Sequence, residues 1–233
     1  MKKLMFVIPF AGGSSQSFVS WGDLEVFTFI YVDLPGKGKN RDMPLLSSMK
    51  DMAVFCADYV SFVLKNEGMK EYYLWGHSMG SYLVYEIAKL LIERDELLPE
   101  RVILSGTAGP ERMQRDEMRW NMLCDERFLD YIVDFGLVNK RVSKSRFFLN
   151  MFFPAIKNDY KVLLDYHTEK VMIPRLRAIV INGEDDTITS EDAMQWSEYF
   201  EEEIRYMWVP GNHFFVLNGK KIVDEIYEEI SGR

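Results

Sequence analysis

Ser78 stands in a pattern typical of a serine nucleophile. Residues 76–80 have the form Gly-x-Ser-x-Gly, an apolar run precedes them, and a helical pattern follows them. A strand, a sharp turn and a helix expose such a serine at the end of a sheet. Glycine is expected at Gly76 and Gly80 because a Cβ in so tight a turn would clash with the neighbouring chain. The alternative is a serine that only caps a helix, and the strand-turn-helix setting favours the nucleophile.

A serine hydroxyl needs a base to take its proton, and the usual base is a histidine held by a carboxylate. The chain has three histidines. His77 adjoins the serine and should point away from it, and His167 lies in a stretch rich in aromatic residues. His213 follows the last predicted strand, so we expect it at the same sheet edge as Ser78. A lone loop histidine is usually solvated or a cap, but elimination of its rivals makes His213 the predicted base.

The carboxylate should lie between the serine and the histidine in the chain. Residues 181–187 follow an apolar run and contain three acids. The Gly-x-x-Asp spacing from Gly183 favours Asp186 over Asp185, and the other acids are expected to form a turn or cap the next helix. Asp186 is therefore the predicted acid, with Asp185 as the alternative.

An acyl-transfer oxyanion needs two fixed N–H donors. One should be the backbone of Met79, which follows the nucleophile. The second should come from the loop at residues 9–15, where two glycines let the backbone turn toward the site and either Ala11 or Phe10 presents its amide. We expect Ala11, although a plain strand exit or an anion-binding turn would also explain the glycines.

Six short apolar runs bounded by turn residues predict buried strands of a parallel sheet. Helical patterns alternate with them, which predicts right-handed crossovers and helices on both faces of a mostly parallel sheet. The predicted strands are 4–8, 26–32, 72–75, 101–104, 178–181 and 204–208. One predicted helix begins near residue 49 and ends at Gly68. The other predicted helices span 79–93, 191–200 and 220–230.

The interval of about 110–174 breaks the alternation. It contains no convincing strand but several helical segments dense in aromatic residues. An insertion of this kind after a strand is typical of a lid over the carboxyl edge of a sheet. We therefore expect a single α/β domain over 1–233 with a helical lid insertion at about 110–174.

Composition excludes several classes of protein. The 233 residues include 36 acidic and 28 basic side chains, and a net charge of −8 argues against nucleic-acid binding. The two cysteines lie in no metal-binding pattern, so we expect no metal, no cofactor and a reducing, cytoplasmic location. No apolar run approaches the roughly 18 residues of a membrane helix. Residues 1–10 imitate a signal peptide, but Pro9 and the following turn favour a buried strand.

Six ordered motifs resemble the landmarks of type II thioesterases, the stand-alone editing hydrolases of non-ribosomal peptide and polyketide assembly lines. The resemblance implies an α/β-hydrolase fold with a helical lid and a triad of Ser78, Asp186 and His213. It also implies hydrolysis of acyl groups stalled on the phosphopantetheine arm of carrier domains. The motifs are Ile8-Pro9-Phe10-Ala11-Gly12-Gly13, Leu34-Pro35-Gly36-Lys37-Gly38, Gly76-His77-Ser78-Met79-Gly80, Ser105-Gly106-Thr107-Ala108-Gly109-Pro110, Gly183-Glu184-Asp185-Asp186 and Gly211-Asn212-His213-Phe214-Phe215.

The chain departs from this family at three positions. The family often has histidine where Phe10 stands and arginine where Lys37 and Asn40 stand. No predicted catalytic residue is affected. Two other functions remain open: a carboxylester esterase or lipase, and a catalytically idle relative that binds a ligand or partner.

Two features of the predicted lid bear on substrate and partner. Four basic residues within seven positions form either a solvated helix face or a docking patch for an acidic carrier domain. Five methionines form either an adaptable acyl pocket or ordinary packing onto the sheet. The basic residues are Lys140, Arg141, Lys144 and Arg146, and the methionines are Met113, Met118, Met122, Met151 and Met172.

Overall fold

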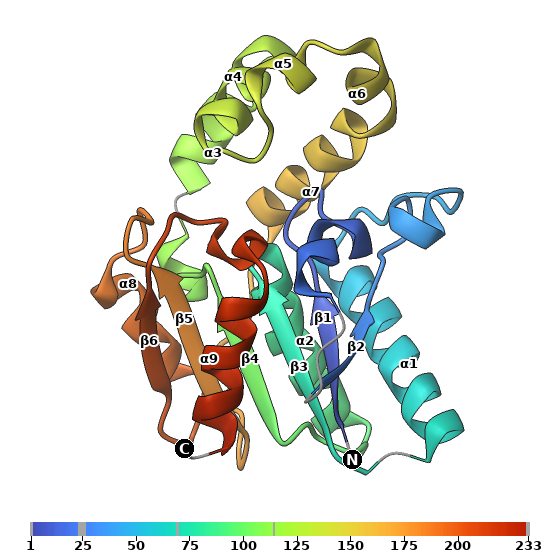
Figure 1. The fold of residues 1–233 in the computed structure, drawn as a ribbon, viewed down its shortest axis with the longest axis vertical. Coiled ribbons are helices and arrows are strands. Elements are labelled where there is room, and N and C mark those ends of the chain that lie inside the picture. Colours follow the sequence, from blue (N-terminus) through green and yellow to red (C-terminus); the bar gives the residue numbers. More distant parts are fainter. Residues whose placement is uncertain (1, 23–26, 69, 114, 232–233) are drawn as a thin grey trace.

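A computed structural model describes residues 2–22, 27–68, 70–113 and 115–231. Its centre is a six-stranded sheet in the order β2-β1-β3-β4-β5-β6 (Figure 1), and every neighbouring pair is parallel. Each predicted strand is present, and residue 26 of the second lies outside the described residues. The strands are β1 (Lys3–Ile8), β2 (Phe27–Tyr31), β3 (Tyr72–His77), β4 (Arg101–Ser105), β5 (Arg177–Gly183) and β6 (Arg205–Val209).

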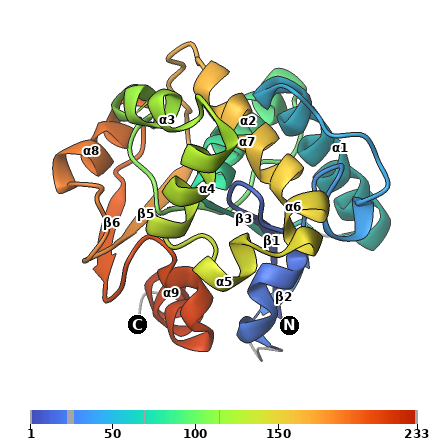
Figure 2. The same cartoon turned by 90° about the horizontal axis from the view of Figure 1, so that it is seen from above.

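Both faces of the sheet are buried, as predicted from the apolar runs. Along β1, Leu4, Phe6 and Ile8 belong to one apolar cluster, and Met5 and Val7 belong to another. This alternation is what the two-residue period of a strand requires when both faces are covered. Figure 2 shows α1 (Met49–Glu67) and α2 (Met79–Glu93) on one side of the sheet and α9 (Lys220–Ser231) on the other.

Local capping sets the ends of these helices. The Ser48 hydroxyl accepts a hydrogen bond from the Asp51 amide at the start of α1. Gly68 ends the helix with a left-handed φ of 63°, as predicted, and its N–H binds the Leu64 carbonyl. Short 3-10 helices occur at η1 (Ser15–Trp21), η2 (Gly38–Asn40) and η5 (Phe215–Asn218).

The predicted helix at 191–200 is wrong in length. The α-helix α8 covers only Ser190–Met194, and a 3-10 turn, η4, continues over Gln195–Glu198. The hydroxyl of Ser197 donates to the Met194 carbonyl at 2.8 Å. A serine that bonds to the backbone three residues earlier competes with regular helical pairing, which fits the tightening observed here.

Helices fill the insertion between β4 and β5 and lie across the carboxyl edge of the sheet (Figures 1 and 2). Their aromatic side chains pack on one another, with Phe128 at ring-centroid distances of 5.7 Å from Phe153 and 5.0 Å from Tyr160. Past the last of them, the described chain reaches β5 with one isolated bridge, Ile173 to Phe200. The helical elements are η3 (Pro110–Arg112), α3 (Arg115–Asn121), α4 (Asp125–Asp134), α5 (Lys140–Ser143), α6 (Arg146–Met151) and α7 (Phe153–Asp165).

Among the described residues, none of the helices combines the length and the apolar character that crossing a membrane requires.

Thiol reactivity tests the burial of α1. Cys56 is fully buried, and burial raises the pKa of its thiol to about 12, against an opposing effect of Lys37. Cys124 is exposed. Because the thiolate is the reactive form, we expect one fast-reacting thiol per native chain at pH 8 with a disulfide reagent, and two after unfolding in guanidinium. Cys124→Ser should abolish the fast reaction, and two fast thiols in the native protein would contradict the packing of α1.

Candidate active site

Ser78 occupies a strained turn between β3 and α2. Its φ of 54° and ψ of −116° lie outside the regions that residues with a side chain normally adopt. Such a conformation costs about 1–3 kcal/mol and persists only where the surroundings hold it. The Ser78 amide donates to the Ser105 carbonyl of β4 at 2.7 Å, and its carbonyl accepts from the Ser81 amide at 2.9 Å. The serine is therefore fixed by backbone contacts, and its hydroxyl has no capping bond.

The two glycines of the motif are required by close backbone packing, as predicted. A Cβ at Gly76 would lie 2.1 Å from the Gly80 carbonyl oxygen. A Cβ at Gly80 would lie 2.2 Å from the Ile8 carbonyl oxygen, at the end of β1. The elbow consequently touches the strand that leads into the predicted oxyanion loop.

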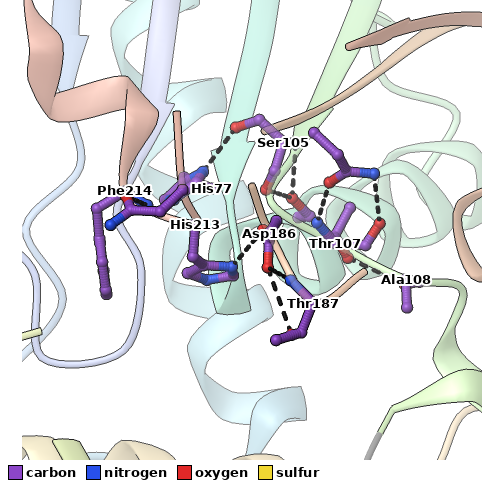
Figure 3. Close-up of polar contacts among 11 residues, drawn as sticks. His77, Ser105, Thr107, Ala108, Asp186, Thr187, His213 and Phe214 are labelled. Carbon is purple, nitrogen blue, oxygen red and sulfur yellow. Dashed lines mark hydrogen bonds and ion pairs between the residues drawn. The ribbon is translucent and has the colours of Figure 1, made fainter. Parts of the chain in front are cut away.

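His213 and Asp186 form a direct hydrogen bond. His213 follows β6, Asp186 follows β5, and the histidine Nδ1 lies 2.8 Å from the carboxylate Oδ2 (Figure 3). Asp185, the alternative acid, is exposed, and its amide binds the Gly211 carbonyl at 3.0 Å. Of the two candidate acids, the structure brings Asp186 to the histidine.

The charge of Asp186 defines the histidine tautomer. Burial favours the neutral carboxyl, but hydrogen bonding and charge attraction from His213, with amides at Thr187 and Ile188, outweigh it and lower the pKa of Asp186. The carboxylate therefore stays ionised at neutral pH and can only accept a hydrogen bond, which Nδ1–H donates. The His213 Nε2 is buried and has no hydrogen-bond partner within the described part of the chain. This nitrogen is left with a lone pair that can take a proton.

His77 has a structural role and not a catalytic one. Burial and the nearby His213 lower its pKa well below the usual range, so its ring is neutral. Its Nδ1 lies 2.9 Å from the Ser105 hydroxyl (Figure 3). This hydroxyl also accepts from Trp75 and donates to the Gly76 carbonyl. Since the single hydroxyl proton is already used, Nδ1 must be the donor to Ser105. As predicted, His77 is absent from the cavity that Ser78 lines.

Ser105 and Asn182 are supporting residues that the sequence analysis missed. Ser105 joins the elbow strand to β4, as described above. The Asn182 side chain accepts from the Thr107 amide at 2.8 Å and donates to the Thr107 carbonyl at 3.4 Å, which pairs the ends of β4 and β5. A polar residue directly after an apolar run is a possible signal for Asn182, because the strand extends to Gly183 and a buried amide needs such partners.

The predicted oxyanion donors come from adjoining segments. Met79 is the first residue of α2, where backbone amides have no partner within the helix. Ala11 lies in a tight turn closed by a 2.8 Å bond from the Gly13 amide to the Phe10 carbonyl. Ala11 shares a cavity with Ser78 and His213. The other candidate, Phe10, is absent from that lining and packs its ring against His77 and Phe214.

This cavity has a volume of about 120 Å³ and lies between the sheet edge and the insertion. Its apolar wall comes largely from helices of the insertion. Met113 and Met118 line it, Met122 is partly buried against the core, and Met151 and Met172 are exposed, so only the first two are placed for an acyl pocket. The insertion contributes Arg112 and an apolar wall of Met113, Met118, Tyr131, Phe135, Tyr160 and Leu163.

His167 is not part of this arrangement. It is exposed and lines a different cavity, together with Glu86 and Lys89. Within the ranges that the structure describes, no three histidine, cysteine or acidic side chains are grouped so that they could hold a metal ion.

The parallel sheet, the strained serine turn and the paired histidine and aspartate define an α/β hydrolase. The Thioesterase domain family matches residues 3–233, and this chain belongs to that family. The sequence is 27% identical over 221 residues to the medium-chain S-acyl fatty acid synthase thioesterase of Rattus norvegicus, covering 91% of this chain and 81% of the relative.

Two other similar proteins are named for biosynthetic pathways. Gramicidin S biosynthesis protein GrsT of Aneurinibacillus migulanus is 22% identical over 226 residues, covering 94% of this chain and 85% of GrsT. The structure of YbtT, a type II thioesterase from the yersiniabactin NRPS/PKS pathway, matches with a TM-score of 0.80 at 22% identity, covering 98% of this chain and 91% of YbtT. The resemblance to type II thioesterases is confirmed.

The geometry ranks the two candidate acids. Asp186→Asn should lower kcat for thioester hydrolysis by roughly 10²-fold or more, since an amide cannot hold the required tautomer and stabilise the imidazolium. Asp185→Asn removes the same charge from an exposed side chain and should change kcat less than about twofold. Steady-state kinetics of both variants against one acyl thioester provide the comparison. A larger loss in the Asp185 variant would reverse the assignment.

Proposed function

We propose that this chain hydrolyses acyl thioesters on the phosphopantetheine arm of carrier domains and removes aberrant or stalled acyl groups in non-ribosomal peptide or polyketide synthesis. One observation carries the proposal: Ser78 and His213 line one cavity, and Asp186 binds the far nitrogen of the histidine. Membership of the thioesterase family selects the thioester among the substrates of such a site.

In the first step, the Ser78 hydroxyl oxygen attacks the thioester carbonyl carbon, and His213 Nε2 takes its proton. The carbonyl electrons move to oxygen, where the Met79 and Ala11 amides stabilise the charge. The carbon–sulfur bond then breaks, and the histidine returns the proton to the leaving pantetheine thiolate. The acyl group remains as an ester on Ser78.

In the second step, water replaces the thiol. His213 takes a proton from water as the oxygen attacks the acyl ester, and the same two amides hold the oxyanion. Collapse releases the carboxylic acid and returns the proton to Ser78. Asp186 remains ionised throughout, and its hydrogen bond stabilises the imidazolium formed in each step.

The two alternative functions make different demands on this site. A carboxylester hydrolase would use the same residues, and relative turnover of acyl-carrier thioesters and simple esters separates it from a thioesterase. An idle binding protein needs no base, but here the histidine has both an ionised partner and an unpaired Nε2 among the described residues. This arrangement supports catalysis.

The proposed partners are acyl and peptidyl carrier domains, and the proposed location is the cytoplasm, where such assembly lines present their thioesters. GrsT is named for gramicidin S biosynthesis, and YbtT for an NRPS/PKS pathway. These names support a biosynthetic role. The rat relative is named for fatty acid synthase, so acyl-loaded carriers of both kinds belong in the substrate panel.

Removal of the nucleophile or the base should abolish turnover. Ser78→Ala and His213→Ala are each expected to lower kcat/KM by roughly 10³-fold or more, because members of a triad act as a unit. Release of free acid from acyl-loaded carriers, followed by mass spectrometry, gives the rate, and circular dichroism checks the fold. A Ser78→Ala enzyme that keeps more than about a tenth of the wild-type rate would exclude the acyl-enzyme mechanism.

Carrier docking is a separate part of the proposal. Lys140, Arg141, Lys144 and Arg146 are all exposed, around α5 and the start of α6. Complementary charge mainly raises association rates and weakens with salt. The double variant Arg141→Glu/Lys144→Glu should therefore lower kcat/KM for acyl-carrier substrates about three- to tenfold, and less at high salt. Hydrolysis of an N-acetylcysteamine thioester should stay near wild type.

Lys65→Glu/Lys70→Glu is a matched control for this variant. It makes the same charge change at two exposed positions near the C-terminal end of α1, away from the insertion (Figure 1). Equal losses in both double variants would indicate a general charge effect. Equal slowing of both substrates in the Arg141/Lys144 variant would indicate a structural role for the patch, and no slowing would indicate a solvated surface.

A further inference from the structure

A buried ion pair joins the insertion to the loop after β2. The Lys37 ammonium binds the Asp159 carboxylate Oδ2, and the two side chains are 4% and 0% exposed. Lys37 precedes η2, and Asp159 lies in α7. Burial of two charges carries a large desolvation cost, so pairs of this kind are weak contributors to stability and their retention calls for another explanation.

The same carboxylate oxygen holds the turn proposed to form the oxyanion site. Asp159 Oδ2 accepts the Gly12 N–H at 2.7 Å. Gly12 has a φ of 77°, and the turn is closed by the Gly13-to-Phe10 bond. Ala11, whose amide is the proposed donor, is therefore followed directly by a residue whose N–H is fixed by Asp159.

Packing reinforces this contact. A Cβ at Gly12 would lie 2.4 Å from Cγ1 of Ile156, which is one turn before Asp159 on α7. Residues three apart lie on the same face of a helix. One face of α7 thus supplies both an apolar contact and a hydrogen-bond acceptor to the turn, and no side chain larger than hydrogen fits at Gly12.

Lys37 is the cation that compensates the buried Asp159 carboxylate. Within the described residues, the other carboxylate oxygen, Oδ1, is buried and has no hydrogen-bond partner. Both hydrogen bonds to Asp159 therefore converge on Oδ2. An unpaired buried carboxylate would be strongly unfavourable, and Lys37 offsets that cost.

We propose that Lys37 and Asp159 are positioning residues that orient the Ala11 amide for the oxyanion through the bond to Gly12. The inference rests on the proposed function, because it assigns these residues to the oxyanion site of that reaction. Its consequence is kinetic. The oxyanion exists only in the tetrahedral states, so loss of orientation lowers kcat and leaves KM nearly unchanged.

Two double variants separate positioning from charge pairing. Lys37→Met/Asp159→Asn removes both charges but keeps a carbonyl oxygen that can accept the Gly12 N–H. Lys37→Met/Asp159→Leu removes both charges and the acceptor. We expect the asparagine pair to keep kcat within about threefold of wild type and the leucine pair to lose roughly 10- to 100-fold, at most the effect of one oxyanion donor.

Hydrogen bonds of Asp33 also connect the loop after β1 with the loop after β2. Neither double variant removes them, which supports folding of both variants. Asp33 accepts the Ser15 amide at 2.6 Å through Oδ1 and the Lys39 amide at 3.0 Å through Oδ2. Melting temperatures check folding, and Lys37→Met/Asp159→Val replaces the leucine pair if that pair does not fold. Lys157→Ala is the matched control, because it breaks an exposed ion pair from the same helix to Asp125 and should leave kcat unchanged.

The assay uses an N-acetylcysteamine thioester, together with inhibition by an acyl trifluoromethyl ketone that forms a tetrahedral adduct on the serine. Support requires a lower kcat and a proportionally higher inhibition constant in the leucine pair, with the asparagine pair and Lys157→Ala near wild type. Equal kcat in the two double variants, or losses confined to KM, would overturn the inference. Failure of the wild-type enzyme to hydrolyse any thioester would instead reject the proposed function.

Discussion

The backbone of Ser78 is the constraint on which the rest of the site depends. A residue with a side chain at φ 54° is stable only because its neighbours leave no better conformation. The Ser105 carbonyl of β4 holds its amide, and the end of β1 packs so closely that Gly80 has no space for a Cβ. The nucleophile is thus held between β1 and β4, the two strands that flank β3. This arrangement requires those strands to be parallel and in this register.

That parallel arrangement explains how side chains distant in sequence reach one place. Each strand ends at the same edge, so the loops after β1, β3, β5 and β6 deliver Ala11, Ser78, Asp186 and His213 to a single region. Two carboxylates stabilise opposite sides of this region. Asp186 binds the histidine from β5, whereas Asp159 holds the first loop from α7. The insertion is therefore a structural part of the region in addition to covering it.

Sequence patterns predicted most of the framework because its physics is local. Strands buried on both faces appear as short apolar runs, and the glycines around Ser78 signal a tight turn. Asp186 could be favoured over Asp185 because the spacing from Gly183 places only one of them at the end of the turn. The break in the helix at 191–200 was not predicted, because the side-chain bonds to the Met194 carbonyl from Ser197 and from the distant Tyr206 do not appear in the apolar pattern.

The features that could not be predicted are those made between distant segments. Lys37 and Asp159 are 122 residues apart, and their types alone are typical of solvated surface residues. Asn182 follows an apolar run, and nothing in the sequence indicates that Thr107 supplies its partners. The helices within 110–174 pack aromatic side chains on one another. Their apolar residues therefore do not follow a simple one-sided helical pattern, and the sequence does not show where each helix begins and ends.

The contacts of α7 restrict how a substrate can reach the cavity. Displacement of α7 would expose the Lys37–Asp159 pair, remove the acceptor of the Gly12 amide and separate Ile156 from the turn. Loss of any of these contacts would disorder the proposed oxyanion loop at the time when the substrate has to bind beside it. Met118, Tyr131 and Phe135 also line the cavity, but the nearest neighbour of the Gly12 position is Ile156 of α7. The order of the proposed oxyanion loop therefore depends on α7 staying in place while substrate binds.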